Sequence, residues 1–387
     1  MALRGLPRAV RLFQMPVVVG AHDYHALRIV EVRHETSDAI SVSFEVPDAL
    51  RPVFVSKPGQ HLGVRATIDG EEQRRSYSIW SRPDEVHPRI AIKQVAGGLF
   101  SVWARNTLHV GQMLDVMPPA GRFVLPPGDG TRRHILAFAA GSGITPIMAM
   151  IAHALAHEPE THFTLVYGNR APQSILFREH LEDLKDRHLD RFTVLHTLSR
   201  NDESTAALLQ GRITAEKVGT LAKGVAHLPD IAHVFLCGPG SMIKDVRNAL
   251  FALGLPRERV HHEFFAAGGG AYRRSNPAAP STSHEPPSSG AEDTAAAQVT
   301  VILDGMRHRF SVPAGRHVVD AAIEAGIRVP FSCKGGMCCT CRARIVEGAA
   351  VMANNYSLEP WEMEKGFILT CQAIPTTPQL VIDYDQM

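Results

Sequence analysis

The chain has 387 residues, of which 45% are hydrophobic and 20% charged, and its formal net charge at pH 7 is +1. Its length predicts two or three domains rather than one. The small net charge gives no reason to expect nucleic-acid binding or a polybasic membrane anchor, and no apolar run is long enough to span a bilayer. These totals favour a multidomain protein without a nucleic-acid or membrane partner.

The first 24 residues contain arginines and no acidic residue before Asp23. A transit peptide has a similar composition, and so has a loose extension upstream of a later start at Met15. We interpret residues 1–24 as an extension and draw no function from them. No secretory signal is visible, so we expect a cytoplasmic protein.

Alternating apolar and polar residues predict β-strands from residue 25 onward. Residues 27–32 and 40–46 show this alternation, and turns rich in proline and glycine separate the predicted strands. Short strands at this spacing favour a small antiparallel barrel. We therefore predict a β-barrel domain over residues 25–128.

One strand of this region, residues 75–78 (RSYS), carries a cation, an aromatic ring and a hydroxyl close together. Side chains two residues apart share a face of a strand, so Arg75 and Tyr77 should point the same way. A flavin needs a cation for its pyrophosphate, a ring against its isoalloxazine and a hydrogen-bonding group near its redox nitrogen. A surface strand with a basic rim is the alternative interpretation.

With the glycine turn at residues 97–101 (GGLFS), this motif resembles the ferredoxin–NADP reductase superfamily. In that superfamily the first motif binds FAD, and the second is a turn at a helix start that holds the FAD pyrophosphate. The resemblance implies that Arg75 binds the pyrophosphate, Tyr77 covers the isoalloxazine and Ser78 lies at the flavin N5 edge. The other residues that it implies for FAD are Ser76, Gly97, Gly98 and Ser101.

From about residue 129 the pattern changes to alternating strands and helices. Residues 133–140, 163–168 and 234–240 each combine a buried-strand run with a glycine-containing turn. This order predicts a parallel sheet with ligands at the carboxyl ends of its strands. We therefore predict an α/β nucleotide-binding domain over residues 129–265.

The first of these turns has the spacing G-x-G-x-x-P over residues 141–146. Its glycines let backbone amides approach a diphosphate at a helix N-terminus, and proline suits the first helical position. The superfamily resemblance assigns this turn and the later C-G-P turn to the nicotinamide dinucleotide. The residues expected there are Gly141, Gly143, Thr145, Pro146, Cys237, Gly238 and Pro239.

The resemblance also implies residues at the reacting atoms. Cys237 would lie near the nicotinamide, although a buried thiol at a strand end is the plain alternative. Glu263 and Phe265, at the end of the domain, would lie near the flavin. Together with Tyr77 and Ser78, Cys237 and Glu263 form the expected catalytic set.

The loops after two predicted strands carry hydroxyl and guanidinium groups instead of the acidic residue typical of NAD sites. Arg170 follows one strand, and Ser199 and Arg200 follow the next. A hydroxyl beside an arginine suits a 2′-phosphate, so we predict a preference for NADPH. Solvated loop residues are the alternative interpretation.

The composition changes again at residue 266. Residues 266–297 are rich in Gly, Pro, Ser and Ala, which predicts a flexible linker. Residues 299–312 then predict a hairpin, and residues 318–326 a short helix that ends at a glycine. The segment 298–387 resembles the plant-type ferredoxin module, which implies a β-grasp fold.

Five of the six cysteines lie in this last segment, four of them within nine residues. The spacing C-x4-C-x2-C followed by a distant cysteine is that of a plant-type [2Fe–2S] cluster. A zinc site or disulfides are the alternatives, but the second C-x2-C pair of a zinc site and a secretory signal are both missing from the sequence. The predicted ligands are Cys333, Cys338, Cys341 and Cys371. Cys339 is left over, at a position where we expect glycine.

The order of these parts predicts a function. A nicotinamide gives up two electrons, a [2Fe–2S] cluster accepts one, and FAD exchanges electrons both ways, so FAD must lie between them. The order resembles the reductase components of bacterial multicomponent oxygenases, and most of all the reductase subunits of phenylacetyl-CoA epoxidases. It implies an oxygenase or epoxidase component as electron acceptor and a place in phenylacetate catabolism.

Two alternatives remain open at this point. The same three modules serve the reductases of other oxygenases, desaturases and hybrid-cluster proteins. From a different class, the chain could be a redox sensor whose cluster responds to oxidants, although an intact path for hydride argues against this.

Overall fold

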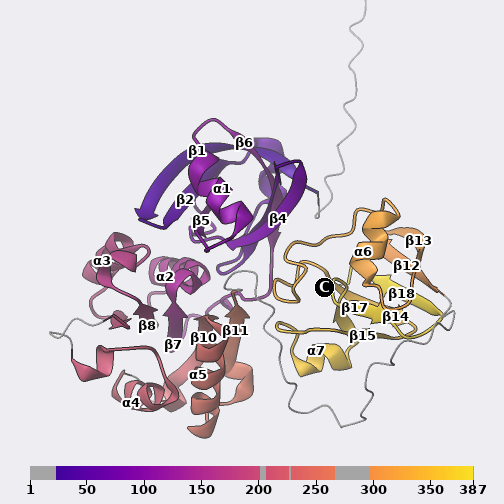
Figure 1. The fold of residues 1–387 in the computed structure, drawn as a ribbon. Helices are drawn as coiled ribbons and strands as arrows, with labels where there is room; N and C mark the ends of the chain where they lie inside the picture. The colour runs from indigo at the N-terminus through magenta and orange to yellow at the C-terminus, as the bar shows by residue number, and fades with distance from the viewer. Residues whose placement is uncertain (1–22, 201–205, 226–227, 266–295, 387) are drawn as a thin grey trace, which may run out of the picture.

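The computed structural model describes residues 23–200, 206–225, 228–265 and 296–386 (Figure 1). Nearly all of the predicted extension and of the predicted linker lies outside these residues. Within them, no helix is both long enough and apolar enough to cross a membrane.

The first domain is a six-stranded antiparallel sheet with strand order β4-β3-β6-β1-β2-β5. An isolated bridge between Ile79 and Ile90 joins its two edges and closes it into a barrel. Strands β3 and β4 form an antiparallel hairpin. Asp69 and Gly70, both with positive φ, form its turn, which is the two-residue type that hairpins favour. The elements are β1 (His25–Thr36), β2 (Ala39–Glu45), β3 (His61–Ile68), β4 (Glu71–Ser78), β5 (Arg89–Lys93), α1 (Leu99–Thr107) and β6 (Met113–Ala120).

The second domain is a five-stranded parallel sheet with strand order β11-β10-β7-β8-β9. Helices cover both of its faces (Figure 1). Its elements are β7 (Arg133–Ala140), α2 (Ile144–His157), β8 (Thr161–Asn169), α3 (Arg178–Arg187), β9 (Phe192–Leu198), α4 (Ala215–Val225), β10 (Ile231–Gly238), α5 (Gly240–Ala252) and β11 (Val260–Phe264).

Strand β7 shows why this sheet is apolar on both sides. Ile135, Ala137 and Ala139 belong to the core under α2 and α3, whereas Leu136 and Phe138 belong to the core under α4 and α5. Because both faces are covered, the strand is an uninterrupted apolar run instead of an alternating one.

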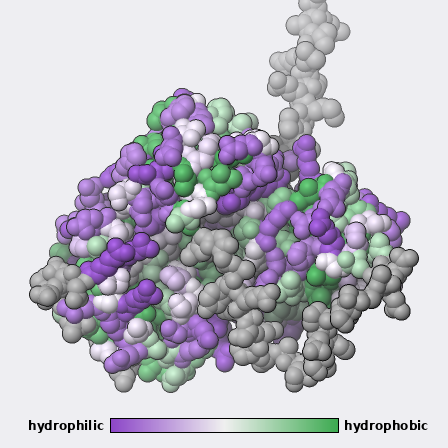
Figure 2. Space-filling view, in the orientation of Figure 1, coloured by the Kyte–Doolittle hydropathy of each residue, from purple (hydrophilic) through white to green (hydrophobic). Residues whose placement is uncertain are grey.

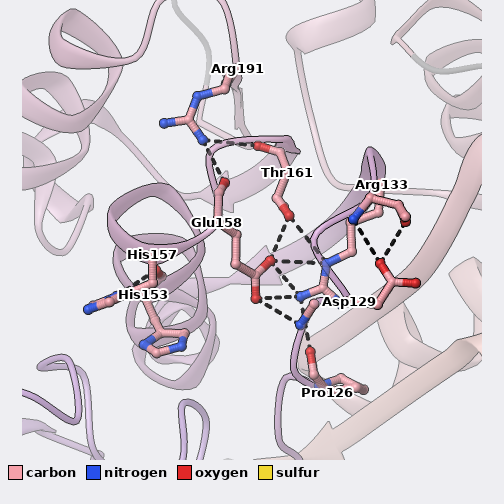
Figure 3. Close-up of polar contacts among 10 residues, drawn as sticks. Pro126, Asp129, Arg133, His153, His157, Glu158, Thr161 and Arg191 are labelled. Atoms are coloured by element: carbon pink, nitrogen blue, oxygen red, sulfur yellow. Dashed lines mark hydrogen bonds and ion pairs between the residues drawn. The ribbon is translucent and has the colours of Figure 1, made fainter.

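A partly buried ionic network joins the barrel to the second domain (Figure 3). Arg133 and Glu158 form an ion pair of 2.6 Å, with side chains only 9% and 14% exposed. The Arg133 guanidinium donates to the Pro126 carbonyl, and the Gly128 amide donates to the Glu158 carboxylate. The network lies at the start of β7, away from the carboxyl ends of the strands, so it fixes the domains and leaves the ligand edge open.

The third domain is a five-stranded sheet of order β13-β12-β18-β14-β16, with a separate two-stranded sheet, β15-β17. The β12–β18 pair is parallel and the other pairs of the larger sheet are antiparallel. Apolar residues of α6 fill the core against this sheet. The elements are β12 (Ala297–Leu303), β13 (Met306–Val312), α6 (Val318–Glu324), β14 (Arg342–Glu347), β15 (Ala350–Met352), α7 (Pro360–Glu364), β16 (Phe367–Leu369), β17 (Ala373–Pro375) and β18 (Gln379–Asp383).

The third domain lies beside the barrel and beside the β11 edge of the second domain (Figure 1). The face in view is mainly hydrophilic, with hydrophobic residues in scattered groups (Figure 2). Apolar residues of the barrel, such as Trp80 and Phe123, share one core with the second domain, whereas polar and aromatic contacts join the barrel to the third domain.

Candidate functional site

Strand β4 presents two different faces, as its alternation predicts. On one face Tyr77 lies 5.8 Å from the Phe100 ring of α1, and burial raises its pKa well above the usual range, which the Arg75 charge opposes. The Arg75 side chain is exposed and donates to the Arg74 carbonyl and to Gln73. A cation and a half-buried ring therefore lie together beside the start of α1.

The other face of β4 meets the third domain. The Ser76 hydroxyl donates to the Ser332 hydroxyl at 2.9 Å, and the Arg74 guanidinium lies 4.0 Å from the centre of the Phe331 ring. Ser76, predicted with the FAD residues, thus turns its side chain away from Arg75 and Tyr77. Any contact between Ser76 and a cofactor on their face would use its backbone.

Ser78, at the end of β4, hydrogen-bonds to the Glu263 carboxyl on β11. Burial, and then the nearby Cys338 thiol, raise the pKa of Glu263 to about 8. The second carboxyl oxygen of Glu263 is shielded from solvent and finds no hydrogen-bond partner within the described part of the chain. Cys237 pairs with Glu263 in register across β10 and β11, so three of the four residues of the expected catalytic set lie together.

The turn before α1 is built by glycines. Gly97 has φ +72°, and a Cβ on Gly98 would lie 2.7 Å from the Ser101 hydroxyl oxygen. That hydroxyl accepts from the Val95 amide and donates to the Gly98 carbonyl, so Ser101 shapes the turn. Since Gly98, the N-cap residue, has no side chain to cap the helix, the first amides of α1 are left for an anion.

The turn between β7 and α2 lies against the end of β10. Gly141 has φ +55°, and its carbonyl accepts from the Tyr167 hydroxyl at 2.9 Å. A Cβ on Gly143 would come within 2.8 Å of the Gly238 amide nitrogen and closer still to the Cys237 carbonyl. The predicted G-x-G and C-G-P turns therefore meet at the carboxyl edge of the sheet.

Three details of this turn refine the predictions. Pro146 is the third residue of α2, not the first as predicted, because a short 3-10 turn over Gly141–Gly143 leads directly into the helix at Ile144. Thr145 donates its hydroxyl to the Ser142 carbonyl at 3.0 Å and so shapes the turn. Cys237 is fully buried, and burial raises the pKa of its thiol well above the usual range.

The residues predicted to read a 2′-phosphate lie on two adjoining loops. The Ser199 amide donates to the Asn169 carbonyl at 3.0 Å, and the Arg200 amide donates to the Arg170 carbonyl at 2.8 Å. The side chains of Ser199, Arg200 and Arg170 are all exposed. Because β8 and β9 are parallel neighbours, the two arginines come close together although they are thirty positions apart in the sequence.

The cysteines of the third domain come together in two pairs. The thiols of Cys333 and Cys338 hydrogen-bond to each other, as do those of Cys341 and Cys371. Cys333 also accepts from the Gly335 amide at 3.4 Å, and these hydrogen bonds lower its pKa to about 7. All six cysteines are free thiols in this structure.

The arrangement of the thiols in two pairs favours a two-iron cluster over a single metal ion. Among the described residues no group of three or more His, Cys, Asp or Glu side chains is arranged to hold one metal ion. Two separate thiol pairs instead suit two irons with two cysteines each. Backbone amides of Gly335, Met337 and Gly336 point at the sulfurs, as a negatively charged cluster requires.

Cys339 has a structural place in this loop. Its φ of +57° is left-handed, which explains why glycine is expected there. Its thiol donates to the Ser357 hydroxyl at 3.0 Å, and that hydroxyl donates to the Gly336 carbonyl. Cys339 therefore ties the cluster loop to the segment before α7 and remains outside the four-thiol set.

Sequence reasoning missed the residues that join the barrel to the third domain. His61 on β3 is 2% exposed, and its Nε2 lies 3.2 Å from the Thr340 hydroxyl; burial lowers the pKa of His61 to about 4. Arg122 pairs with the fully buried Glu362 of α7, which also pairs with Arg342. No local pattern reveals such partners, since His61 and Thr340 are 279 positions apart.

Comparisons with known proteins match this arrangement. Three family models cover the chain in order: the oxidoreductase FAD-binding domain over residues 26–125, the oxidoreductase NAD-binding domain over 138–248 and the 2Fe-2S iron-sulfur cluster binding domain over 301–376. A subunit of the 1,2-phenylacetyl-CoA epoxidase of Escherichia coli (strain K12) is 39% identical over 94% of this chain and 98% of its own length. The chain belongs to this family of flavin and iron–sulfur reductases.

Other members and solved structures of this reductase family agree. The ferredoxin reductase component of 3-ketosteroid-9-alpha-monooxygenase from Rhodococcus rhodochrous is 36% identical over 92% of this chain and 96% of its own length. The structure of phthalate dioxygenase reductase covers 93% of this chain and 98% of its own, with a TM-score of 0.56 and 23% identity. The predicted fold class is confirmed: an antiparallel FAD-binding barrel, a parallel-sheet nicotinamide domain and a ferredoxin domain.

As a reductase of this family, the protein is an oxidoreductase that transfers electrons from a pyridine nucleotide through FAD to a [2Fe–2S] cluster. FAD, a pyridine nucleotide and a [2Fe–2S] cluster are thereby confirmed as cofactors, and the preference for NADPH stays a prediction. The residues present fit them: paired thiols for the cluster, an uncapped α1 for a phosphate, and an orphaned carboxyl oxygen beside Ser78 for the redox centre.

Proposed function

We propose that this reductase takes electrons from NADPH and delivers them to a phenylacetyl-CoA epoxidase. The path of the electrons inside the protein rests on the position of β4: Arg75 and Tyr77 occupy one face, and Ser76 contacts the cluster loop from the other. A cofactor held by the first face would lie one strand away from the loop. Short separation favours rapid electron transfer, so this arrangement supports a reductase rather than a sensor.

When bound, the nicotinamide gives electrons in pairs, FAD exchanges them in pairs or singly, and the [2Fe–2S] cluster passes them on singly. The residues of the protein itself bind these groups, exclude water and hold a proton. Arg75 and the α1 amides, reached across Gly97 and Gly98, neutralise pyrophosphate charge. Tyr77 covers the isoalloxazine and excludes water. Glu263, whose pKa is about 8, holds a proton at neutral pH beside Ser78.

The nicotinamide site would lie at the meeting point of the β7–α2 and β10–α5 turns. Gly141 and Gly143 let the backbone approach the diphosphate, and Cys237 forms a neutral, buried wall beside Glu263. Thr145 and Pro146 set the start of α2, and Gly238 and Pro239 set the start of α5. Phe265 packs against the core under α2 and closes the flavin side.

The proposed domains follow the sheets: residues 25–128 for FAD, 129–265 for NADPH and 298–387 for the cluster. Cys333, Cys338, Cys341 and Cys371 would hold the cluster, each thiol pair at one iron. The proposed location is the cytoplasm, where reducing conditions keep the ligand thiols free.

The preference for NADPH rests on the exposed set of Arg170, Ser199 and Arg200. The kcat/KM for NADPH should exceed that for NADH. The substitution Arg200→Ala should lower it for NADPH by about tenfold, the loss expected for one charge-assisted hydrogen bond, and leave the NADH value unchanged. A wild-type preference for NADH would refute this part of the proposal.

The choice of acceptor rests on the E. coli relative, which is similar over nearly its whole length. The purified chain should support NADPH-driven epoxidation of phenylacetyl-CoA by the catalytic epoxidase component, with NADPH consumed in proportion to product. The runner-up acceptor is another oxygenase, favoured by the ketosteroid relative. Faster coupled turnover with that monooxygenase component than with the epoxidase would reverse the order.

A further inference from the structure

A hydrogen-bonded chain crosses from the barrel to a cluster ligand. The Nε2 atom of His61 lies 3.2 Å from the Thr340 hydroxyl, and the Cys338 sulfur lies 3.2 Å from the same hydroxyl. Both His61 and Thr340 are buried, at 2% and 7% exposure. The barrel thus reaches a ligand sulfur through only one intervening side chain.

The surroundings hold His61 in this place. Its ring lies over Gly121, where a Cβ would come 2.7 Å from Nδ1, so glycine leaves the room that the imidazole occupies. The Ser76–Ser332 hydrogen bond and the Arg74–Phe331 contact fix the loop next to Cys333. Contacts from the barrel therefore flank the loop on both sides, but among the described residues the contact of His61 is the one that continues to a ligand sulfur.

The two hydrogen bonds run in one direction, from His61 through Thr340 to Cys338, once Cys338 is a thiolate ligand. A thiolate accepts but cannot donate, so the Thr340 hydroxyl donates its proton to the sulfur. The lone pairs of that hydroxyl then accept from a protonated Nε2 of neutral His61. Each group makes its bond without a conflict of donors.

We propose that His61 is a positioning residue for electron transfer into the cluster, acting through Thr340 on Cys338. The proposal rests on the proposed function and adds a residue to it. Each electron passes between cofactors without making or breaking a bond, so His61 and Thr340 keep their protons throughout. Their part is to fix the distance of the Cys338 edge from the barrel and to stabilise charge on its sulfur.

The test uses the full-length reductase loaded with FAD and cluster. His61→Phe keeps a flat aromatic ring, although a larger one, and removes both ring nitrogens. Thr340→Val removes the hydroxyl with little change of shape, and Thr340→Ser keeps the hydroxyl. The exposed His109, changed to Phe in the same domain, is the matched control. Three quantities are measured: the rate of cluster reduction after NADPH addition, the cluster reduction potential, and the EPR g-values of the dithionite-reduced cluster.

Thr340→Val and His61→Phe should each slow cluster reduction by about tenfold, the factor for one hydrogen bond to a charged group. Both should lower the reduction potential and shift the g-values, because hydrogen bonds to the sulfurs raise the potential. Thr340→Ser and His109→Phe should resemble the wild type. The double variant should be no slower than Thr340→Val, since both changes break one chain.

Wild-type potential, g-values and rate in Thr340→Val would overturn the proposal, even if His61→Phe failed to bind FAD. If the reduction potential and g-values shifted in Thr340→Val but not in a folded His61→Phe, the proposed role of His61 would be overturned. The potential and g-values are measured without NADPH, so they test the role of His61 independently of the proposed function. The proposed function would be refuted if NADPH left the flavin of the wild-type protein oxidised.

Discussion

Three ionisable side chains on β3 and β11 are neutral at neutral pH. Burial lowers the pKa of His61 and of His261 to about 4 and raises that of Glu263 to about 8. Burial penalises the charged form of each group, so the histidines lose a proton and the carboxyl keeps one at neutral pH. His61, His261 and Glu263 therefore add no charge to the site at neutral pH.

His261 gives a prediction for acid stability. Its Nε2 lies 3.1 Å from Nδ1 of His233, and its ring stacks on Phe235 at 4.9 Å. Its pKa is about 4 in the fold and about 6.5 in the unfolded chain, so the unfolded state takes up the proton first as the pH falls. The stability it contributes is complete above pH 6.5 or so and is lost toward pH 4.

The measurement is urea unfolding of wild type and His261→Gln at pH 7.5 and pH 5. The wild type should lose more stability between the two than the variant does, and His109→Gln serves as the control. Equal losses in wild type and His261→Gln would show that the proton on His261 does not distinguish the folded from the unfolded chain.

At the scale of elements, the site depends on where two turns meet. Gly143 lies at the start of α2 against the end of β10, with no room for a Cβ beside Cys237 and Gly238. A methyl group there must push helix and strand apart, because protein interiors adjust little. The approach of α2 to β10 is thus set by one glycine.

Gly143→Ala should destabilise the nicotinamide domain by about 1–3 kcal/mol and raise the KM for NADPH. Gly219→Ala is the control: nothing lies within 4 Å of a Cβ there, and alanine in the interior of α4 should stabilise by about 0.5–1 kcal/mol. Thermal unfolding and steady-state kinetics measure both effects. A Gly143→Ala variant with wild-type stability and KM would refute the close approach.

The elements that sequence patterns predict well are those whose signal is local. The period of two placed Arg75 and Tyr77 on one face of β4, and the buried run at residues 133–140 gave the central strand β7. The same period should have placed Ser76 on the opposite face. The start of α2 was harder to predict, because Gly141 and Gly143 permit both a loop and the 3-10 turn that leads to Ile144.

At the scale of the whole molecule, the docking of the ferredoxin domain could not be predicted. Its contacts join residues far apart in the chain, such as Arg122 with Glu362, and depend on how complete domains meet. Glu362 is fully buried between Arg122 and Arg342, and it also caps α7 by accepting from the Glu359 amide. One carboxyl thus serves both the helix and the domain interface.

Arg122→Ala should loosen this docking without unfolding the ferredoxin domain, because Arg342 still neutralises Glu362. The docked arrangement loses one of its charged contacts, so flavin reduction by NADPH should stay normal while cluster reduction slows. Arg51→Ala removes an arginine from the exposed pair with Asp48 and should change neither rate. Stopped-flow kinetics compares the two variants. An unaltered rate of cluster reduction in Arg122→Ala would mean that the Arg122–Glu362 ion pair does not hold the ferredoxin domain in the position that allows electron transfer.

The central claim is an order of electron transfer, from NADPH through FAD to the [2Fe–2S] cluster. Anaerobic stopped-flow mixing of the loaded protein with NADPH measures it directly, with wild type and Cys371→Ser compared. The flavin absorbance should bleach first and the cluster absorbance second, and Cys371→Ser should keep the first phase and lose the second. Cluster reduction without a preceding flavin phase, or loss of both phases in Cys371→Ser, would contradict the account.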